Sequence, residues 1–258
     1  MYKPVHRGSS IGVLAWYVGL RSEDLYEVES GRALLDRLAG GLIVSCQARA
    51  GHPLHDPQII AAMAKAAEAG GAVGVRINGE SDIRAVREVV SLPIIGLLKV
   101  WMPDSPVYIT PTFEDAAAVA EAGADIIALD ATARPRPGGE RLEDLIPRIR
   151  KFPRPVLADV ATLEEGKRAV ALGADMVATT LSGYTGTAPP PEGPDLELVR
   201  QLSRALSVPV LAEGRYSTPD QVREAFRAGA FAVVVGRAIT DPLMLTQNFV
   251  EATKRHRS

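Results

Sequence analysis

A lysine and a glutamate close two otherwise apolar segments of this sequence. Lys99 follows Pro-Ile-Ile-Gly-Leu-Leu, and Glu213 follows Pro-Val-Leu-Ala. Lysine is costly to bury unless it has a partner or a task, so a strand that merely becomes polar at its end explains Lys99 poorly. A lysine and a carboxylate in one small pocket shift each other's proton affinity and can share two proton transfers. We therefore interpret Lys99 and Glu213 as an acid/base pair.

Polar or charged side chains end most of the other apolar runs as well. They are Gln47, Arg76, Asp130, Asp159 and the pair Thr179-Thr180. The simple alternative is that a strand becomes polar where it leaves the core, which would account for any one of them alone. Taken together, these side chains indicate a functional site at the strand ends.

The elements that would position these residues alternate along the chain. Four times, a helical pattern ends at a small Gly-Ala turn that leads directly into an apolar run, which is typical of a helix followed by a buried parallel strand. These copies span residues 68–76, 121–130, 171–179 and 227–236. Three more strands begin at proline, over residues 93–99, 155–160 and 209–214, and a strand at 42–47 opens the series. The sequence therefore predicts eight strands.

Stretches with a helical pattern separate the strands, near residues 57–69, 82–90, 113–122, 140–151, 163–172, 196–205, 219–228 and 242–254. Thr162 with Glu165, and Thr218 with Gln221, have the spacing of helix-initiating capping boxes. Eight such units predict an α/β protein, a single-domain (β/α)8 TIM barrel over residues 31–258 with an N-terminal helix and a short N-terminal extension, residues 1–30. An open doubly wound sheet is the alternative, but it would not need eight near-equal units, and no Gly-rich dinucleotide fingerprint is present.

A closed barrel brings the polar strand ends together. Active sites lie at the carboxyl ends of barrel strands, and the third and seventh strands face each other across the mouth. Lys99 is thus expected opposite Glu213, with Asp159 of the fifth strand between them on one side. Barrels often bind phosphate with the loops after strands seven and eight, through backbone N–H groups and a helix N-terminus. We predict that Gly214, Arg215, Gly236 and Arg237 bind a phosphate group, since glycine admits a close anion and arginine adds charge.

Composition argues against several classes of protein. Lys plus Arg number 29 against 31 Asp plus Glu, a net charge of −2 with no basic stripe, so we expect neither a nucleic-acid nor a membrane partner. The single cysteine, Cys46, leaves no intramolecular disulfide framework and is expected to be a small buried residue. His52 and His55 lack acidic neighbours and are expected to be loop residues, so no metal site is predicted. The N-terminus lacks a clear signal peptide, and we expect a cytoplasmic protein.

Five segments of the chain form a distinctive set. They are Gly-Leu-Ile-Val-Ser-Cys-Gln at 41–47, Pro-Ile-Ile-Gly-Leu-Leu-Lys at 93–99, Ile-Ala-Leu-Asp-Ala-Thr at 127–132, Thr-Thr-Leu-Ser-Gly-Tyr-Thr at 179–185 and Ala-Glu-Gly-Arg at 212–215. Together they resemble the N-acylmannosamine-6-phosphate 2-epimerases. The resemblance covers about residues 40–249. This family interconverts N-acetylmannosamine 6-phosphate and N-acetylglucosamine 6-phosphate in sialic acid breakdown, without a metal or an organic cofactor.

The resemblance implies proton transfer at C2 of the sugar, which is acidic because it lies next to the aldehyde of the open chain. Lys99 matches the family's catalytic lysine and Glu213 its partner carboxylate. One would remove the C2 proton from one face and the other would return a proton to the opposite face. Arg76 and Asp159 match substrate-contacting residues, and Gln47 and Thr180 are expected to bind the sugar as well. The enediolate between the two steps needs hydrogen-bond donors or positive charge nearby. No cofactor is expected.

The sequence departs from the family in two places. Val-Trp follows Lys99, where the family usually has arginine and an acidic residue. The loop after the eighth strand ends in Asp241 instead of an arginine, and Arg237 stands four residues earlier. Residues before Gly31 have no counterpart in the family, and they are either an added segment or the result of an upstream start codon.

Two other functions stay open at this point. One is another lysine barrel enzyme that acts on a phosphosugar, such as a Schiff-base aldolase or an indole-glycerol-phosphate synthase-like protein. The other is a non-catalytic sugar-phosphate sensor, which the change at Asp241 keeps open. The oligomeric state is also open, with a homodimer among the alternatives. The Pro/Gly-rich segment 186–194 is expected to be a solvated loop, with a lid over the site as the alternative.

Overall fold

The predicted barrel is confirmed. The computed structural model describes residues 31–187 and 189–254, so the expected extension at 1–30 lies outside the described residues. Eight parallel strands close in chain order, each paired with its two neighbours along the chain and β8 paired with β1. They are β1 (Leu42–Cys46), β2 (Gly74–Asn78), β3 (Ile94–Leu97), β4 (Ile126–Asp130), β5 (Val156–Asp159), β6 (Met176–Ala178), β7 (Val210–Glu213) and β8 (Ala232–Val235). All eight carboxyl ends therefore lie at one rim.

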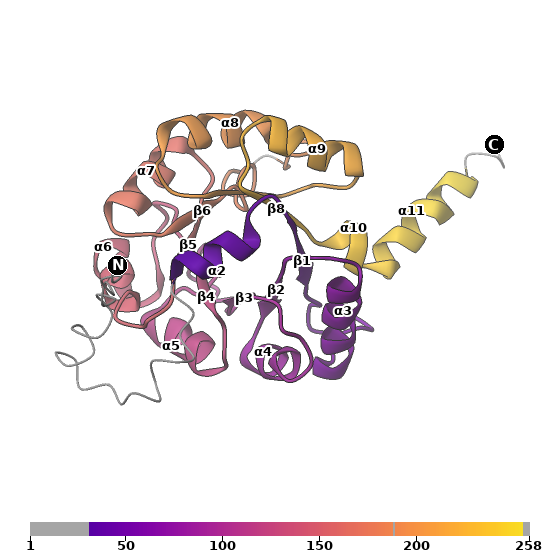
Figure 1. Cartoon of the computed structure of the whole chain (residues 1–258), viewed down its shortest axis with the longest axis horizontal. Helices are drawn as coiled ribbons and strands as arrows, with labels where there is room; N and C mark the ends of the chain where they lie inside the picture. Colours follow the sequence, from indigo (N-terminus) through magenta and orange to yellow (C-terminus); the bar gives the residue numbers. More distant parts are fainter. Residues whose placement is uncertain (1–30, 188, 255–258) are drawn as a thin grey trace, which may run out of the picture.

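Helices follow the strands and surround them, except α2, which precedes β1 and lies across one end of the barrel (Figure 1). They are α2 (Gly31–Leu38), α3 (Pro57–Ala69), α4 (Glu80–Arg87), α5 (Phe113–Glu121), α6 (Leu142–Ile149), α7 (Leu163–Ala171), α8 (Leu196–Ala205), α9 (Pro219–Arg227), α10 (Arg237–Thr240) and α11 (Pro242–Lys254). The capping boxes expected at Thr162 and Thr218 are both formed. Helix α6 begins two residues later than expected, because Pro137–Gly139 forms a separate 3₁₀ turn, η1.

Two apolar layers hold the barrel together. Side chains inside it, such as Ile95, Leu97 and Leu157, form one buried cluster, and Leu34 and Leu38 of α2 pack into it. Outward-facing strand side chains pack against the helices. Gly96 faces outward, and a Cβ there would lie 2.5 Å from the Cβ of Ala124, so glycine at this position lets α5 and its following turn pack close against β3.

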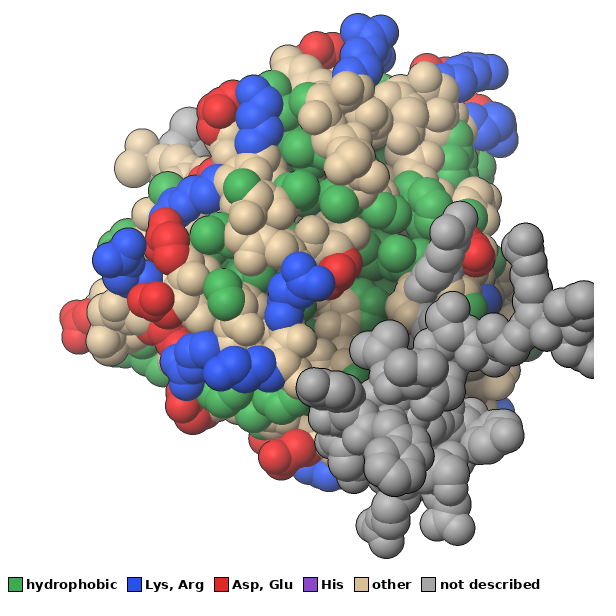
Figure 2. Space-filling model, turned by 60° about the vertical axis from the view of Figure 1, so that its left-hand side comes forward, with side chains coloured by type: hydrophobic (Ala, Val, Ile, Leu, Met, Phe, Trp, Pro, Cys, Tyr) green, Lys and Arg blue, Asp and Glu red, His purple; other side chains and the backbone are tan. Residues whose placement is uncertain are grey.

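The outer surface carries charges of both signs. Figure 2 shows Lys and Arg side chains interspersed with Asp and Glu on one face of the molecule. None of the helices in the described part of the chain is both long and apolar enough to cross a membrane. Helix α11 is the exception to the compact arrangement, because its ribbon runs away from the barrel (Figure 1).

Candidate active site

Arg76 occupies the centre of the barrel mouth. Its Nη1 and Nη2 donate to Oδ1 and Oδ2 of Asp159, at 3.0 and 2.5 Å, and Nη1 also donates to Oε2 of Glu213. Only 1% of the Arg76 side chain is exposed, and Asp159 is fully buried. Burial opposes the charge of Arg76, but the two carboxylates raise its pKa above the ordinary value. One guanidinium thus ties the ends of β2, β5 and β7 together.

Thr180 completes this cluster from the segment after β6. Its hydroxyl oxygen lies 2.6 Å from Oδ1 of Asp159 and 3.1 Å from Oε2 of Glu213, and it accepts a hydrogen bond of 3.3 Å from Arg76. A hydroxyl has a single proton to donate, so it serves one carboxylate at a time. Thr180, Asp159, Arg76 and Glu213 therefore form one polar network, and the sequence prediction that they lie together is confirmed.

Lys99 reaches the mouth from a segment beyond β3. The strand ends at Leu97, two residues earlier than expected, because Leu98 donates its N–H to Oγ1 of Thr110. The Lys99 backbone N–H donates to Oδ1 of Asn78, at 2.8 Å. Its Nζ donates to Oε1 of Gln47, at 2.7 Å. Lys99 and Glu213 therefore have different nearest partners, and among the described residues no carboxylate lies within ion-pair distance of Lys99.

Burial shifts the proton affinities of both groups towards neutrality. Burial, with the nearby positive charge of Arg76 acting in the same direction, lowers the pKa of Lys99 to about 8. Burial raises the pKa of Glu213, although Arg76 opposes this. We expected Lys99 and Glu213 to shift each other, and each does so weakly, in the direction that favours the charged forms. The net directions come from desolvation, which disfavours charge on either group.

A hairpin that sequence reasoning missed rises from β3 beside Lys99. Lys99 and Ile109 form an antiparallel bridge, and the Val100 N–H donates to the carbonyl of Tyr108. Trp101, 65% exposed, stacks on Tyr108 with 4.0 Å between ring centroids. The departure from the family's residues after Lys99 thus supplies half of an aromatic pair. The available signal was a pair of apolar triplets, Val-Trp-Met at 100–102 and Val-Tyr-Ile at 107–109, separated by the turn residues Pro-Asp-Ser-Pro.

The residues that we expected to bind phosphate lie at the rim, and they differ in how far their side chains already contact the protein. Gly214 has φ +112°, a conformation that other residues rarely adopt. Arg215 is held by backbone carbonyls, since Nε donates to Gly193 and Nη1 to Ser182, both at 2.5 Å. Gly236 precedes α10, and Arg237 is exposed, with no hydrogen bond or ion pair to another described side chain. The guanidinium of Arg215 is therefore committed to protein contacts, while that of Arg237 is free.

Asp241 has a structural task at the start of α11. Its Oδ1 accepts the N–H of Met244, at 2.9 Å, and lies 3.4 Å from Nε2 of His52. His52 also accepts the N–H of Leu54 at its Nδ1, which places it in the β1–α3 loop, as expected. The aspartate that replaces the family's arginine therefore accepts a hydrogen bond at the start of α11 and lies close to the His52 ring.

The remaining predictions concern residues outside the polar network at the barrel mouth. Cys46 is fully buried, as expected, and burial raises the pKa of its thiol to about 12. Segment 186–194 lies in a loop whose described residues are mostly exposed, as expected. Within the described part of the chain, no group of three or more His, Cys, Asp or Glu side chains could hold a metal ion.

A closed parallel barrel with buried polar and charged side chains gathered at one rim is the arrangement of the (β/α)8 barrel enzymes, whose active sites lie at the carboxyl ends of the strands. Residues 60–255 match the family described as "Putative N-acetylmannosamine-6-phosphate epimerase". The chain belongs to this family.

Similar proteins cover nearly the whole described barrel. A 2-epimerase of this name from Caldanaerobacter subterraneus is 51% identical over 226 residues, which is 87% of this chain and 95% of the relative. One from Thermosynechococcus vestitus is 55% identical, over 86% of this chain and 96% of the relative. The solved N-acetylmannosamine-6-phosphate 2-epimerase from Clostridium perfringens is 44% identical and superposes with a TM-score of 0.82, over 85% of this chain and 96% of that one.

Proposed function

We propose that this chain is an isomerase that interconverts N-acetylmannosamine 6-phosphate and N-acetylglucosamine 6-phosphate. The observation that carries the proposal is the buried Lys99 amine, with its pKa lowered to about 8, at the same rim as the raised-pKa carboxyl of Glu213. The family and the relatives named as 2-epimerases support the substrate. The proposal includes the expected cytoplasmic location, the absence of a cofactor, and a barrel domain preceded by a separate extension at residues 1–30.

The proposed reaction uses one proton shared between two groups. The unprotonated group, Lys99 or Glu213, removes the C2 proton, and the C–H electron pair moves into the enediolate of the open-chain sugar. The other group then donates its proton to C2 from the opposite face, and the carbonyl re-forms. The permanent charge of Arg76 lies beside this centre and would stabilise the negative charge that develops on the enediolate. The direction of reaction decides which group acts first.

The other site residues are proposed to hold the sugar phosphate. Gln47 already bonds to the Lys99 amine, so it would orient the amine as well as touch the sugar. Asp159 and Thr180 would fix Glu213 through Arg76 while they contact substrate hydroxyls. At the phosphate end, we propose backbone contacts from Gly214, Arg215 and Gly236 and a charge from Arg237, since the Arg215 guanidinium already serves protein carbonyls.

Proton NMR in D₂O tests the function. With N-acetylmannosamine 6-phosphate, the signals of N-acetylglucosamine 6-phosphate should grow, and C2 of the product should carry deuterium. Borohydride added during turnover should leave the enzyme active and without a sugar adduct, because no imine forms. A reduced lysine adduct would instead favour the Schiff-base alternative. Binding of the sugar phosphate without turnover would favour the sensor.

The ratio kcat/KM is expected to follow a bell-shaped dependence on pH. When Lys99 and Glu213 are both protonated, neither can act as a base, and when both are deprotonated, neither can act as an acid. The lowered pKa of Lys99 places the alkaline fall near pH 8, and the raised pKa of Glu213 places the acidic fall above the ordinary range of glutamate. Initial rates in both directions should give the same profile. An alkaline fall only above about pH 10, the ordinary range of lysine, would contradict the assignment.

We further propose that two copies of the chain form a homodimer through α11. All the described side chains from residue 246 to 253 are exposed, including Phe249 at 77%. A groove of about 450 Å³ beside β1 and α3 is lined mainly by apolar side chains, among them Leu42, Met63 and Ile239. The exposed apolar side chains of α11 could pack into this groove on a second copy of the chain. With a twofold axis between the copies, the α11 helix of each would occupy the groove of the other.

Light scattering after size exclusion tests the dimer. The native chain should elute at twice the chain mass, and Phe249→Asp should move it to the mass of one chain, because a charge would be buried in the interface. Asn248→Asp adds the same charge at the adjacent position of the helix and serves as the matched control. A native chain that elutes as a monomer at micromolar concentration would rule out the proposal.

A further inference from the structure

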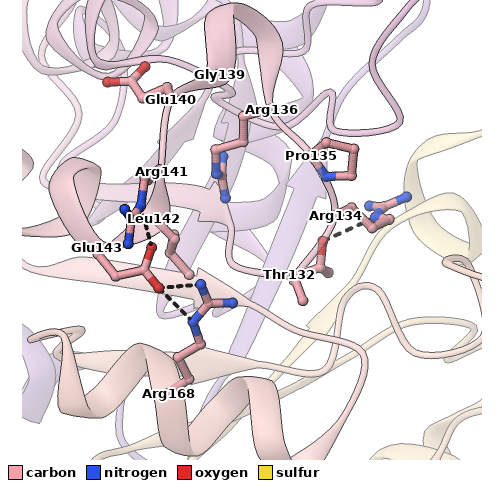
Figure 3. A pocket seen from close by; sticks show the side chains of 11 residues that line it. Thr132, Arg134, Pro135, Arg136, Gly139, Glu140, Arg141, Leu142, Glu143 and Arg168 are labelled. Carbon is pink, nitrogen blue, oxygen red and sulfur yellow. Dashed lines mark hydrogen bonds and ion pairs between the residues drawn. The ribbon is translucent and has the colours of Figure 1, made fainter.

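A second cavity lies outside the catalytic cluster, at the loop between β4 and α6. Its volume is about 330 Å³. Figure 3 shows its lining, which includes Arg134, Arg136, Arg141, Arg168 and the carboxylates of Glu140 and Glu143. None of Lys99, Arg76, Asp159 and Glu213 lines it. The cavity is therefore a separate place where a ligand could bind.

Two of these charged side chains are neutralised by residues outside the cavity. Arg134 pairs with Asp130, with Nη2 2.7 Å from Oδ2. Glu140 accepts hydrogen bonds from Arg148, at 2.7 Å, and from the N–H of Phe113, at 3.1 Å. In Figure 3 its carboxylate points away from the other labelled side chains. The remaining charged side chains of the cavity are those of Arg136, Arg141, Arg168 and Glu143.

Glu143 is the single carboxylate left for this group, and two arginines already share it. Its Oε1 accepts hydrogen bonds from Nε and Nη2 of Arg168, the first at 3.1 Å. Its Oε2 lies 3.6 Å from Nε of Arg141. Figure 3 shows both arginines directed towards it. One negative charge is thus divided between two guanidinium groups before Arg136 is considered.

Arg136 is the strongest sign of a missing anion. It is only 7% exposed, and its terminal nitrogens donate to the main-chain carbonyls of Pro111, at 3.3 Å, and Asp130. Among the described residues, no carboxylate lies within ion-pair distance of it. Burial lowers its pKa, and the carboxylates of Asp130 and Glu140, which lie beyond ion-pair distance, offset this only in part. A buried cation is normally paired, because an unpaired one is expensive.

The backbone around the cavity suits an anion as well. Helix α6 begins beside it, and no side chain caps the N-terminus. Uncapped N–H groups and the helix dipole favour negative charge at this end. Gly139, which also lines the cavity, has φ +73° and no side chain to block an approaching ligand. Backbone and side chains therefore favour the same kind of ligand.

We propose that this cavity is a second ligand site, which binds a small doubly charged oxyanion, a phosphate or phosphate monoester, between Arg136, Arg141 and Arg168. Such an ion offers several oxygen acceptors to several guanidinium groups and supplies the charge that Glu143 cannot. The site is distinct from the phosphate end of the catalytic site at β7 and β8.

Crystals of the full chain soaked in tungstate, a tetrahedral dianion visible by anomalous scattering, would locate the ion. We expect a peak in this cavity in addition to any peak at β7 and β8. In solution, calorimetry with inorganic phosphate should show the corresponding site, weakened about tenfold or more in the double variant Arg141→Gln/Arg168→Gln, since each removes a charge-assisted hydrogen bond. Arg223→Gln/Arg227→Gln on α9 removes the same charge elsewhere and should bind as the native chain does.

A third variant distinguishes binding from damage to the fold. Glu143→Gln removes the competing carboxylate, so it should tighten phosphate binding at this site, which a misfolded protein could not do. The proposal is wrong if tungstate occupies only the catalytic rim or the surface. It is also wrong if the arginine variants bind phosphate as tightly as the native chain, or if Glu143→Gln binds it more weakly.

Discussion

Replacing Lys99 by alanine is expected to lower kcat by about 10²–10⁴-fold, the range that a positioned acid/base group contributes. The physical reason is that one proton transfer in each direction depends on this amine. Gln47 and Asn78 place it at the barrel mouth, and burial brings its pKa to about 8. KM should change far less, because the substitution leaves the proposed phosphate-binding residues at β7 and β8 in place.

Isotope exchange makes this prediction specific to a two-base mechanism. In Lys99→Ala, Glu213 can still act on one face of the sugar, so one epimer should exchange its C2 proton with D₂O slowly and without inversion. In Glu213→Gln, the other epimer should exchange instead. Lys167→Ala, which removes an exposed lysine paired with Glu164 on α7, is the matched control and should leave both rates unchanged. If Lys99→Ala epimerises at close to the native rate, the assignment of Lys99 is wrong.

Replacing Arg76 by methionine is expected to have the largest effect on stability, a loss of about 3–5 kcal/mol in the free energy of unfolding. The variant keeps an unbranched apolar stem but leaves the carboxylates of Asp159 and Glu213 buried without their counter-ion. Arg76→Lys should recover only part of the loss, because an ammonium group cannot bond both oxygens of Asp159 as the guanidinium does.

Urea unfolding followed by circular dichroism measures this loss at a fixed protein concentration. Arg84→Met is the control, since Arg84 pairs with Glu80 on the exposed face of α4 and such pairs contribute only about 0–1 kcal/mol. Equal unfolding midpoints for the Arg76 and Arg84 variants would show that the central guanidinium is not a stabilising residue. If Arg76→Met retains activity, the acidic fall of its pH profile should occur at a higher pH than in the native chain. Arg76 is the main group that lowers the pKa of Glu213, and its loss lets that pKa rise.

Much of the fold could be predicted because its signals are local. The capping boxes at Thr162 and Thr218 need only side chains three residues apart, and the Gly-Ala turns need only the backbone freedom of glycine. Parallel strands joined by helices necessarily end at one rim. For this reason, Arg76, Asp159, Thr180 and Glu213 could be assigned to one site before any side chain was placed.

Which side chains contact each other could not be predicted in the same way. The family resemblance implied that Arg76 contacts substrate, and only the structure shows that its nitrogens also bond to Asp159 and Glu213. It offered Arg215 as a phosphate ligand, but the backbone carbonyls of Ser182 and Gly193 hold that guanidinium. Such outcomes depend on competition among acceptors that lie far apart in the chain and meet only when the barrel closes.

The barrel, the rim where the polar strand ends gather and the types of residue on it could be predicted from the chain alone, because periodicity, turns and strand polarity are properties of neighbouring residues. Folding in three dimensions was needed to show that Lys99 bonds Gln47, that Asp241 lies at the start of α11 close to His52, and that the buried guanidinium of Arg136 donates to main-chain carbonyls. Desolvation and pairing are properties of surroundings assembled from distant segments. Those surroundings, and not the residue types alone, set the charge states at the catalytic rim and in the arginine-lined cavity.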